Sequence, residues 1–295
     1  MIKISTQFDA GSVVVKDLTN PANIRLELRP DNASDFAQWF YFRLQGAAYQ
    51  NCVMHFENAA DSAYPEGWEG YQACASYDRQ NWFRVPTEYE NGVLTINHTP
   101  LSNSVYYAYF EPYSYEQHLN LLGDAQGSGL CQIDDLGSTV EGRDINLLTI
   151  GNQVESDLKI WIIARQHPGE TMAEWFIEGL LARLLDPQDP TARALLDSAT
   201  FYVVPNMNPD GSALGNLRPN AAAAAPVVPE PAKKSSTQSP GRDEAAIIRL
   251  SRPSGFCVGY PVFSLPVGET IVCHHTSVGS LPRAAFSSVT RPGAI

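Results

Sequence analysis

The chain has 295 residues, a formal net charge of −12 and 44% hydrophobic residues. This length predicts about two domains, and an aromatic content of 10% argues against a disordered chain. The acidic balance argues against a nucleic-acid binder, because such a protein needs a basic face to neutralise phosphates.

Membrane and secretion signals are weak in this sequence. The apolar stretches are interrupted well before the roughly 20 residues that a membrane span needs, and the first ten residues hold no apolar run typical of a signal peptide. The five cysteines are scattered and odd in number, which favours reduced thiols over a disulfide framework. We therefore expect a cytoplasmic protein that acts on neither nucleic acid nor membranes.

The first part of the chain, residues 1–115, has the pattern of an all-β domain. Asn91 and Gly92 form a hairpin signal between the apolar segments 83–86 and 93–96. Further short runs of aromatic and β-branched residues are typical of strands. The two clearest of these runs are residues 38–44 and 105–110. Several short strands with turns between them predict an antiparallel β-sandwich.

The pattern changes over residues 116–220, where strand and helix signals alternate. Residues 170–185 have apolar positions close to the helical period. The other expected elements are a helix over 113–122 and strands over 146–151, 158–164 and 199–205. This alternation predicts an α/β layer fold.

Residues 221–295 differ from the rest. They open with five alanines and continue with prolines, lysines and serines. Ten of the chain's 21 prolines follow residue 218. Because such a composition offers few large apolar residues to offset the entropy of ordering, we expect a divergent or disordered tail.

The strongest chemical signal lies where an apolar strand ends and a helix begins. His167 and Glu170 are three residues apart in a His-Pro-Gly-Glu turn. An imidazole and a carboxylate that converge at a strand end suit Zn²⁺, although a catalytic zinc site needs a third protein ligand. The alternative is an ordinary loop histidine beside a carboxylate that the helix dipole favours.

Three separated motifs give the chain a family resemblance. His167-Pro-Gly-Glu170 is followed by Val204-Pro-Asn-Met-Asn-Pro-Asp-Gly211 and preceded by Glu141-Gly-Arg-Asp144. In this order they resemble the zinc metallocarboxypeptidases related to carboxypeptidase A. The first domain, with Ala75-Ser-Tyr-Asp-Arg-Gln-Asn-Trp-Phe-Arg-Val-Pro86, resembles bacterial members of the cytosolic carboxypeptidase subfamily. The resemblance covers about residues 1–220.

The resemblance implies an α/β domain with a mixed sheet and a role for each matched residue. His167 and Glu170 match the first two zinc ligands. Arg218 matches an arginine that stabilises the developing oxyanion, and Arg143 matches an arginine that contacts the substrate. Both arginines could instead be surface charges. The Asn206–Gly211 segment is read as turn chemistry that redirects the chain after a buried strand.

The family pattern stops after Arg218. An Asn-Arg pair, a third ligand in an Asp-x-His-Gly-like segment and a catalytic glutamate should follow, and none is present. His274 is a candidate third ligand and Glu269 a candidate general base. The altered composition after residue 220 raises the hypothesis of a shifted reading frame or a rearranged gene.

We therefore read the chain as a β-sandwich followed by an incomplete carboxypeptidase domain. The resemblance implies zinc-dependent hydrolysis of C-terminal residues from peptides or proteins. Two alternatives stay open: a catalytically incomplete pseudo-enzyme or binding module, and a zinc amidohydrolase that acts on small amides. If His274 is not a ligand, we expect weak zinc binding and no peptidase activity.

Overall fold

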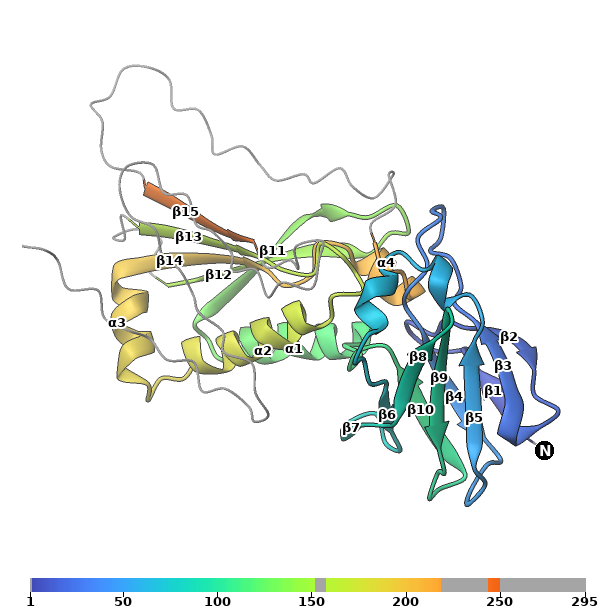
Figure 1. Cartoon of the computed structure of the whole chain (residues 1–295). Coiled ribbons are helices and arrows are strands. Elements are labelled where there is room, and N and C mark those ends of the chain that lie inside the picture. Colours follow the sequence, from blue (N-terminus) through green and yellow to red (C-terminus); the bar gives the residue numbers. More distant parts are fainter. Residues whose placement is uncertain (1, 152–157, 219–243, 250–295) are drawn as a thin grey trace, which may run out of the picture.

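A computed structural model of the chain describes residues 2–151 and 158–218, together with the backbone of residues 244–249 (Figure 1). The first unit consists of two five-stranded sheets. One sheet has the strand order β1 (Lys3–Ser5), β4 (Tyr41–Gln45), β10 (Ser104–Ala108), β6 (Cys74–Ser76) and β7 (Trp82–Arg84). The other has the order β2 (Val14–Asp17), β3 (Ile24–Glu27), β5 (Cys52–Phe56), β9 (Val93–His98) and β8 (Thr87–Glu90).

The two sheets form the expected β-sandwich. Their strand pairs are antiparallel except for β3 and β5, which run parallel. Three short 3₁₀ turns connect strands of this unit, at Pro21–Asn23, Ala59–Asp61 and Pro65–Trp68. The fold prediction for the first domain is confirmed, with one parallel pair added.

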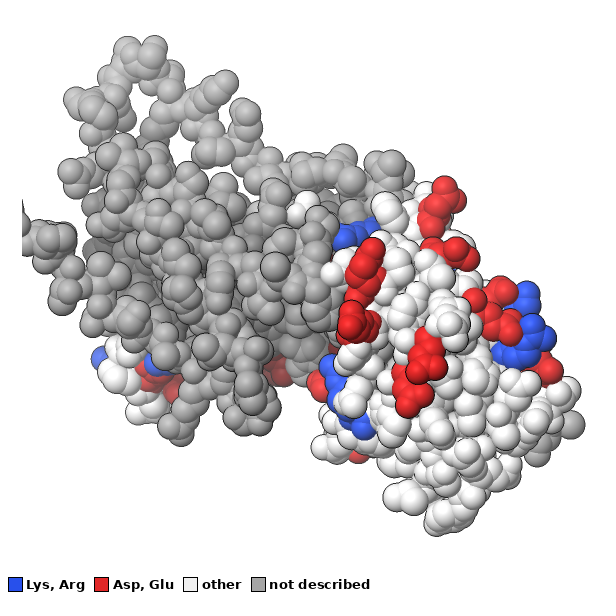
Figure 2. Space-filling model, viewed as in Figure 1, with Lys and Arg blue, Asp and Glu red and all other residues white. Residues whose placement is uncertain are grey.

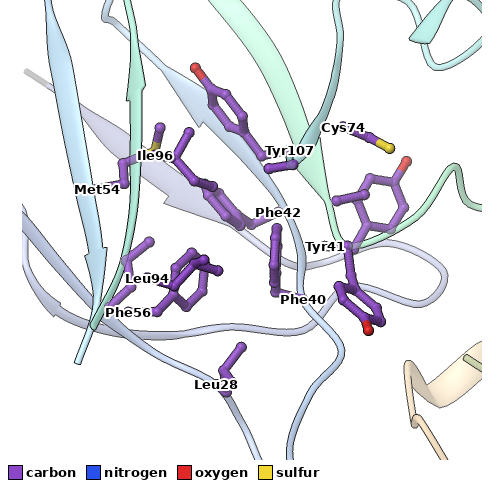
Figure 3. Packing of buried hydrophobic residues seen from close by; sticks show 14 of the residues in the cluster. Leu28, Phe40, Tyr41, Phe42, Met54, Phe56, Cys74, Leu94, Ile96 and Tyr107 are labelled. Atoms are coloured by element: carbon purple, nitrogen blue, oxygen red, sulfur yellow. The ribbon is translucent and has the colours of Figure 1, made fainter. Parts of the chain in front are cut away.

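Aromatic side chains fill the space between the two sheets, as Figure 3 shows. Phe40 lies just before β4 and its ring centre is 4.6 Å from that of Phe56 on β5. Phe42 and Tyr107, from the neighbouring strands β4 and β10, are 5.4 Å apart. All four side chains are fully buried. Burying one such ring contributes about 2 kcal/mol, so this cluster is a principal source of the sandwich's stability.

The hairpin at Asn91 and Gly92 is present, but its first strand differs from the expectation. Both turn residues have positive φ (51° and 84°), as a tight hairpin turn requires. The strand that pairs with β9 is β8, not residues 83–86. Phe83 belongs to β7, which pairs with β6 in the opposite sheet. Pro86 has no N–H for a sheet ladder, and the chain crosses between the sheets there.

The second unit is an α/β layer with a mixed five-stranded sheet. Its strand order is β11 (Cys131–Ser138), β12 (Asp144–Ile150), β14 (Ala199–Val204), β13 (Leu158–Ile163) and β15 (Glu244–Arg249). The strands β13, β14 and β15 run parallel to one another. The strand β12 runs antiparallel to both of its neighbours, β14 and β11. This arrangement confirms the mixed sheet.

The helices of the second unit are α1 (Tyr115–Gly127), α2 (Met172–Leu184), α3 (Pro190–Ser198) and α4 (Pro209–Leu214). In Figure 1, α1 and α2 lie on the same face of the sheet. Leu121 of α1 and Ile177 of α2 share one buried cluster with Ile162 and Val203 of the sheet. Ser114 begins α1 with a capping box to Gln117. This layer fixes the position of the loop between β13 and α2.

Sequence reasoning did not anticipate β11, α3 or α4. The sequence of β11 is Cys-Gln-Ile-Asp-Asp-Leu-Gly-Ser, whose polar residues obscure a strand pattern, and the strand has an irregular register near Ser138. The helix α3 begins with Asp189 as N-cap and Pro190 as its first residue, a start signal that was available.

Most of the expected tail, residues 221–295, lies outside the described residues. The backbone of β15 is described, and it pairs in parallel with β13 beyond the expected boundary at residue 220. In Figure 2, acidic side chains form separate patches on the visible face of the sandwich, in keeping with the charge of −12. The described thiols, those of Cys52, Cys74 and Cys131, are free.

Within residues 2–151 and 158–218, no helix combines the length and the apolar character that crossing a membrane demands.

Candidate metal centre

The segment between β13 and α2, residues 164–171, holds both sequence-predicted metal ligands and is called the ligand loop here. His167 Nδ1 lies 3.1 Å from Glu170 Oε1. The Glu170 side chain is nearly buried, whereas that of His167 is about one quarter exposed, at 24%. The structure therefore brings the two residues together at the carboxyl end of a parallel strand, where α/β folds place ligand sites.

Arg218 completes a three-residue cluster with this pair. Its Nη1 lies 3.0 Å from His167 Nδ1 and 4.0 Å from Glu170 Oε1. A guanidinium is always protonated and can only donate. An imidazole nitrogen and a carboxylate oxygen thus face the same cation. These are the donor types that zinc prefers, and they fit two positions of a zinc centre.

A third metal ligand is not found in the described part of the chain, where no group of three His, Cys, Asp or Glu side chains could hold a metal ion. The candidate ligand His274 and the candidate base Glu269 lie outside the described residues. The described residues therefore fit a partial zinc centre.

A buried arginine near the start of the ligand loop fixes the backbone of that loop. Arg165 adopts a positive φ of 49°, which is uncommon for a residue other than glycine. Its Nε donates to the Pro168 carbonyl at 3.0 Å, and its Nη1 donates to the Tyr113 carbonyl at 2.7 Å. The same Nη1 lies 2.7 Å from Glu174 Oε2. These bonds hold the backbone between the two predicted ligands against the first turn of α2 and the start of α1.

Glu174 is the centre of the buried polar network around Arg165. Its Oε1 lies 2.6 Å from His118 Nδ1, and its Oε2 accepts a bond from Asn206 Nδ2 at 3.2 Å. The side chains of Glu174 and His118 are 0% and 1% exposed. Sequence reasoning missed these residues. His118 lies within the helix expected over 113–122, and its partner Glu174 is 56 positions away.

Arg143 lies in a second cluster with acidic partners. Its Nη1 donates to Asp210 Oδ1 at 2.8 Å and to Glu141 Oε2 at 2.7 Å. Its guanidinium carbon lies 5.7 Å from the centre of the Tyr115 ring. Asp210 also accepts the Thr139 hydroxyl at 2.7 Å. The structure thus places Arg143 in an ion-pair cluster, and its substrate-contacting role stays a prediction.

The Asn-Pro-Asp-Gly segment was expected to be a turn, but Pro209, Asp210 and Gly211 begin the helix α4. Asn208 is the N-cap of α4, and its side chain accepts a bond from the Gly211 N–H. On the sandwich, His55 of β5 bonds Thr95, and Glu57 pairs with Arg25.

Comparisons with known proteins agree with this fold. Residues 4–110 match the family model of the cytosolic carboxypeptidase N-terminal domain. Residues 115–236 match the family model of zinc carboxypeptidases, so this match extends past Arg218, where we expected the resemblance to end. The second unit therefore carries a zinc carboxypeptidase domain, and the first unit carries the N-terminal domain of cytosolic carboxypeptidases.

Solved bacterial structures share this two-unit arrangement. A metallo-carboxypeptidase from Burkholderia cenocepacia is 55% identical, with a TM-score of 0.73 over 75% of this chain and 60% of that one. A metallo-carboxypeptidase from Pseudomonas aeruginosa, in complex with (2-guanidinoethylmercapto)succinic acid, is 48% identical. Its TM-score is 0.71 over 74% of this chain and 59% of that one.

Curated relatives include an uncharacterised protein of Zymomonas mobilis, 48% identical over 76% of this chain and 58% of that protein. Human cytosolic carboxypeptidase 1 is 28% identical over 74% of this chain and 21% of its own length. The chain therefore spans about three fifths of these bacterial relatives and about a fifth of the human protein.

Proposed function

We propose that the ligand loop and Arg218 belong to the site of a zinc-dependent metallocarboxypeptidase, a hydrolase that removes C-terminal residues from peptides or proteins. The observation that carries this proposal is the convergence of His167 Nδ1 and Glu170 Oε1 on one cationic group. The location proposed for the protein is the cytoplasm, by analogy with the cytosolic carboxypeptidases that share its first domain.

His167 and Glu170 would hold the metal. Bound zinc polarises a scissile carbonyl and lowers the pKa of its water ligand. The Pro168 carbonyl is fixed by Arg165, so the loop is organised in advance for two ligands. A catalytic zinc site needs a third protein ligand. The sequence offers His274 as the candidate for it and Glu269 as the candidate for the general base, and the His274→Ala variant described below tests the first of these.

Arg218 and Arg143 would act on the substrate in this proposal. Arg218 is partly exposed, at 28%, and lies next to the metal-binding pair, where it could donate hydrogen bonds to a developing oxyanion. Arg143 is already paired with Asp210, so contact with a substrate carboxylate would have to compete with that bond. The Pseudomonas aeruginosa relative was solved with a guanidino dicarboxylic acid. The same compound is a suitable probe for these arginines.

The metal site is tested by zinc affinity, measured by competition with a chromophoric chelator. We expect His167→Ala to reduce the affinity at least tenfold, because removing a ligand removes a coordinate bond. His55→Ala is the matched control, since His55 bonds Thr95 on the sandwich, and it should leave the affinity unchanged. Equal affinities for His167→Ala and the unaltered chain would refute the site.

His274→Ala and a peptide assay separate the remaining alternatives. We expect His274→Ala to keep the weak zinc affinity of a two-ligand site. If it instead loses a tightly bound zinc as His167→Ala does, His274 is the third ligand, and release of C-terminal residues should accompany the metal. Zinc-dependent cleavage of small amides but not peptides would favour an amidohydrolase. A folded chain without zinc would favour a binding module.

A further inference from the structure

A buried carboxylate of the sandwich binds the backbone of the segment that carries Arg218. Asp31 Oδ1 accepts the Leu217 N–H at 2.7 Å, and Asp31 Oδ2 accepts the Arg218 N–H at 2.8 Å. Asp31 is only 5% exposed. Bonds from two successive amides to the two oxygens of one carboxylate fix the direction of the backbone at Arg218. The direction of its Cα–Cβ bond is fixed with it.

The same peptide segment also touches the ligand loop. The Leu217 carbonyl accepts the Gly169 N–H at 3.2 Å, and Gly169 lies between His167 and Glu170. A Cβ on Gly169 would come within 2.9 Å of the Leu217 Cα. Leu217 therefore bonds Asp31 through its N–H and the ligand loop through its C=O.

Neighbouring contacts strengthen the hold of the sandwich on this segment. The Asn32 N–H donates to Asn216 Oδ1 at 3.0 Å, and Arg29 Nη2 donates to the Leu214 carbonyl at 2.7 Å. The Leu217 side chain is 8% exposed and belongs to the core cluster of the sandwich. The first domain thus anchors the backbone up to Arg218, whereas the Arg218 side chain lies beside His167 and Glu170 of the second domain.

We infer that Asp31 is a positioning residue, which holds the Arg218 guanidinium beside His167 and Glu170 from the neighbouring domain. Its importance for turnover rests on the role proposed for Arg218 above. A carboxylate suits this task because ionised acceptors form stronger bonds to backbone N–H groups than neutral acceptors do. An asparagine would keep one acceptor and turn an N–H₂ group toward the other amide.

The test measures how fast phenylglyoxal modifies Arg218 in the full chain, by peptide mass spectrometry. We expect Asp31→Asn to raise the Arg218 rate at least threefold, because the backbone that directs its side chain is released. Arg143 provides an internal reference whose rate should not change. Asp35→Asn is the matched control, since Asp35 lies in the same loop and is exposed. An unchanged Arg218 rate in folded Asp31→Asn would overturn the inference.

Amide hydrogen exchange of the unaltered chain provides a measurement that needs no variant. We expect slow exchange at the N–H groups of Leu217 and Arg218, and fast exchange at both would overturn the inference even if Asp31→Asn failed to fold. Zinc binding and peptidase activity enter neither readout, so failure of the proposed function remains distinguishable. If the chain cleaves peptides, Asp31→Asn alone should lower kcat/KM. Added to Arg218→Ala, the same substitution should lower kcat/KM no further.

Discussion

Glu174 shows how a single buried side chain can organise the loop beside it. Its carboxylate serves His118, Arg165 and Asn206, which come from three different parts of the chain. Arg165 in turn holds the Pro168 carbonyl inside the ligand loop. A carboxylate buried this deeply is tolerated because its oxygens are paired. Losing its charge would leave the Arg165 cation buried without a counter-charge.

We therefore expect Glu174→Gln to lower the free energy of unfolding by about 3 kcal/mol, since breaking a buried ion pair leaves an uncompensated charge. Urea denaturation followed by circular dichroism measures the change. Glu116→Gln provides the control, because Glu116 is exposed at the start of α1. A loss for Glu174→Gln no greater than that of the control would show that Arg165 finds another partner.

The protonation of Asp31 should make stability depend on pH. Burial raises the pKa of Asp31 from 3.8 to about 6, even though bonds from the Arg218 and Leu217 amides lower it. Between these two values the folded chain holds a proton that the unfolded chain has lost. The stability that protonated Asp31 contributes to the folded chain is therefore full below pH 3.8 and is lost as the pH rises through about 6.

Urea unfolding at pH 4 and pH 7 should show a free energy of unfolding that is lower at pH 7, by up to about 3 kcal/mol. This difference is the slope of stability with pH. We expect Asp31→Asn to flatten it, because asparagine does not titrate. Asp35→Asn should keep the slope of the unaltered chain. Burial also raises the pKa of Asp9, so the difference between the two variants isolates Asp31. Equal slopes in both variants would contradict the assignment.

At the scale of elements, the two units approach each other closely where the end of α4 contacts Ala10. Gly215 follows α4 with a φ of +69°, and a Cβ on it would come within 2.5 Å of the Ala10 carbonyl oxygen. The Ala10 N–H in turn donates to the Ala213 carbonyl at 2.8 Å. A glycine is needed here both for its backbone conformation and for its lack of a side chain.

Gly215→Ala and Gly70→Ala separate these two requirements. Gly70 has a φ of +67°, and a Cβ on it would have no neighbouring atom within 4 Å. We expect Gly70→Ala to cost about 1 kcal/mol for the left-handed backbone alone. Gly215→Ala should cost about 1–3 kcal/mol more, because the contact must also be relieved. Thermal unfolding of both variants measures the difference. Equal losses would mean that α4 moves away from Ala10 at little cost.

The elements that sequence reasoning found are those with strong local signals. Asn91 and Gly92 identified a hairpin, and apolar periodicity identified α2 within two residues of its observed start at Met172. The first strand of the hairpin was wrong, because the choice of sheet for Phe83 depends on contacts with β6. Periodicity reports which face of an element is buried, but not which neighbour covers it.

At the scale of the whole molecule, the metal-binding pair was predictable and its supports were not. His167 and Glu170 are close in sequence, and the turn between them is a local feature. Asp31 lies 187 positions from Arg218, and no local pattern distinguishes it from other loop aspartates. Contacts between distant segments follow from the packing of the two domains, which a single sequence does not reveal.

The burial of Leu217 in the sandwich limits how these two domains can be exchanged in evolution or engineering. A recombination breakpoint between residues 110 and 115 looks neutral, because it falls between the two family matches. It would nevertheless pair a foreign sandwich with the native segment 214–218, and so replace Asp31, Asn32 and Arg29 together. A working chimera must therefore take the loop that holds Arg29, Asp31 and Asn32 and the segment 214–218 from the same parent, although the two lie far apart in the sequence.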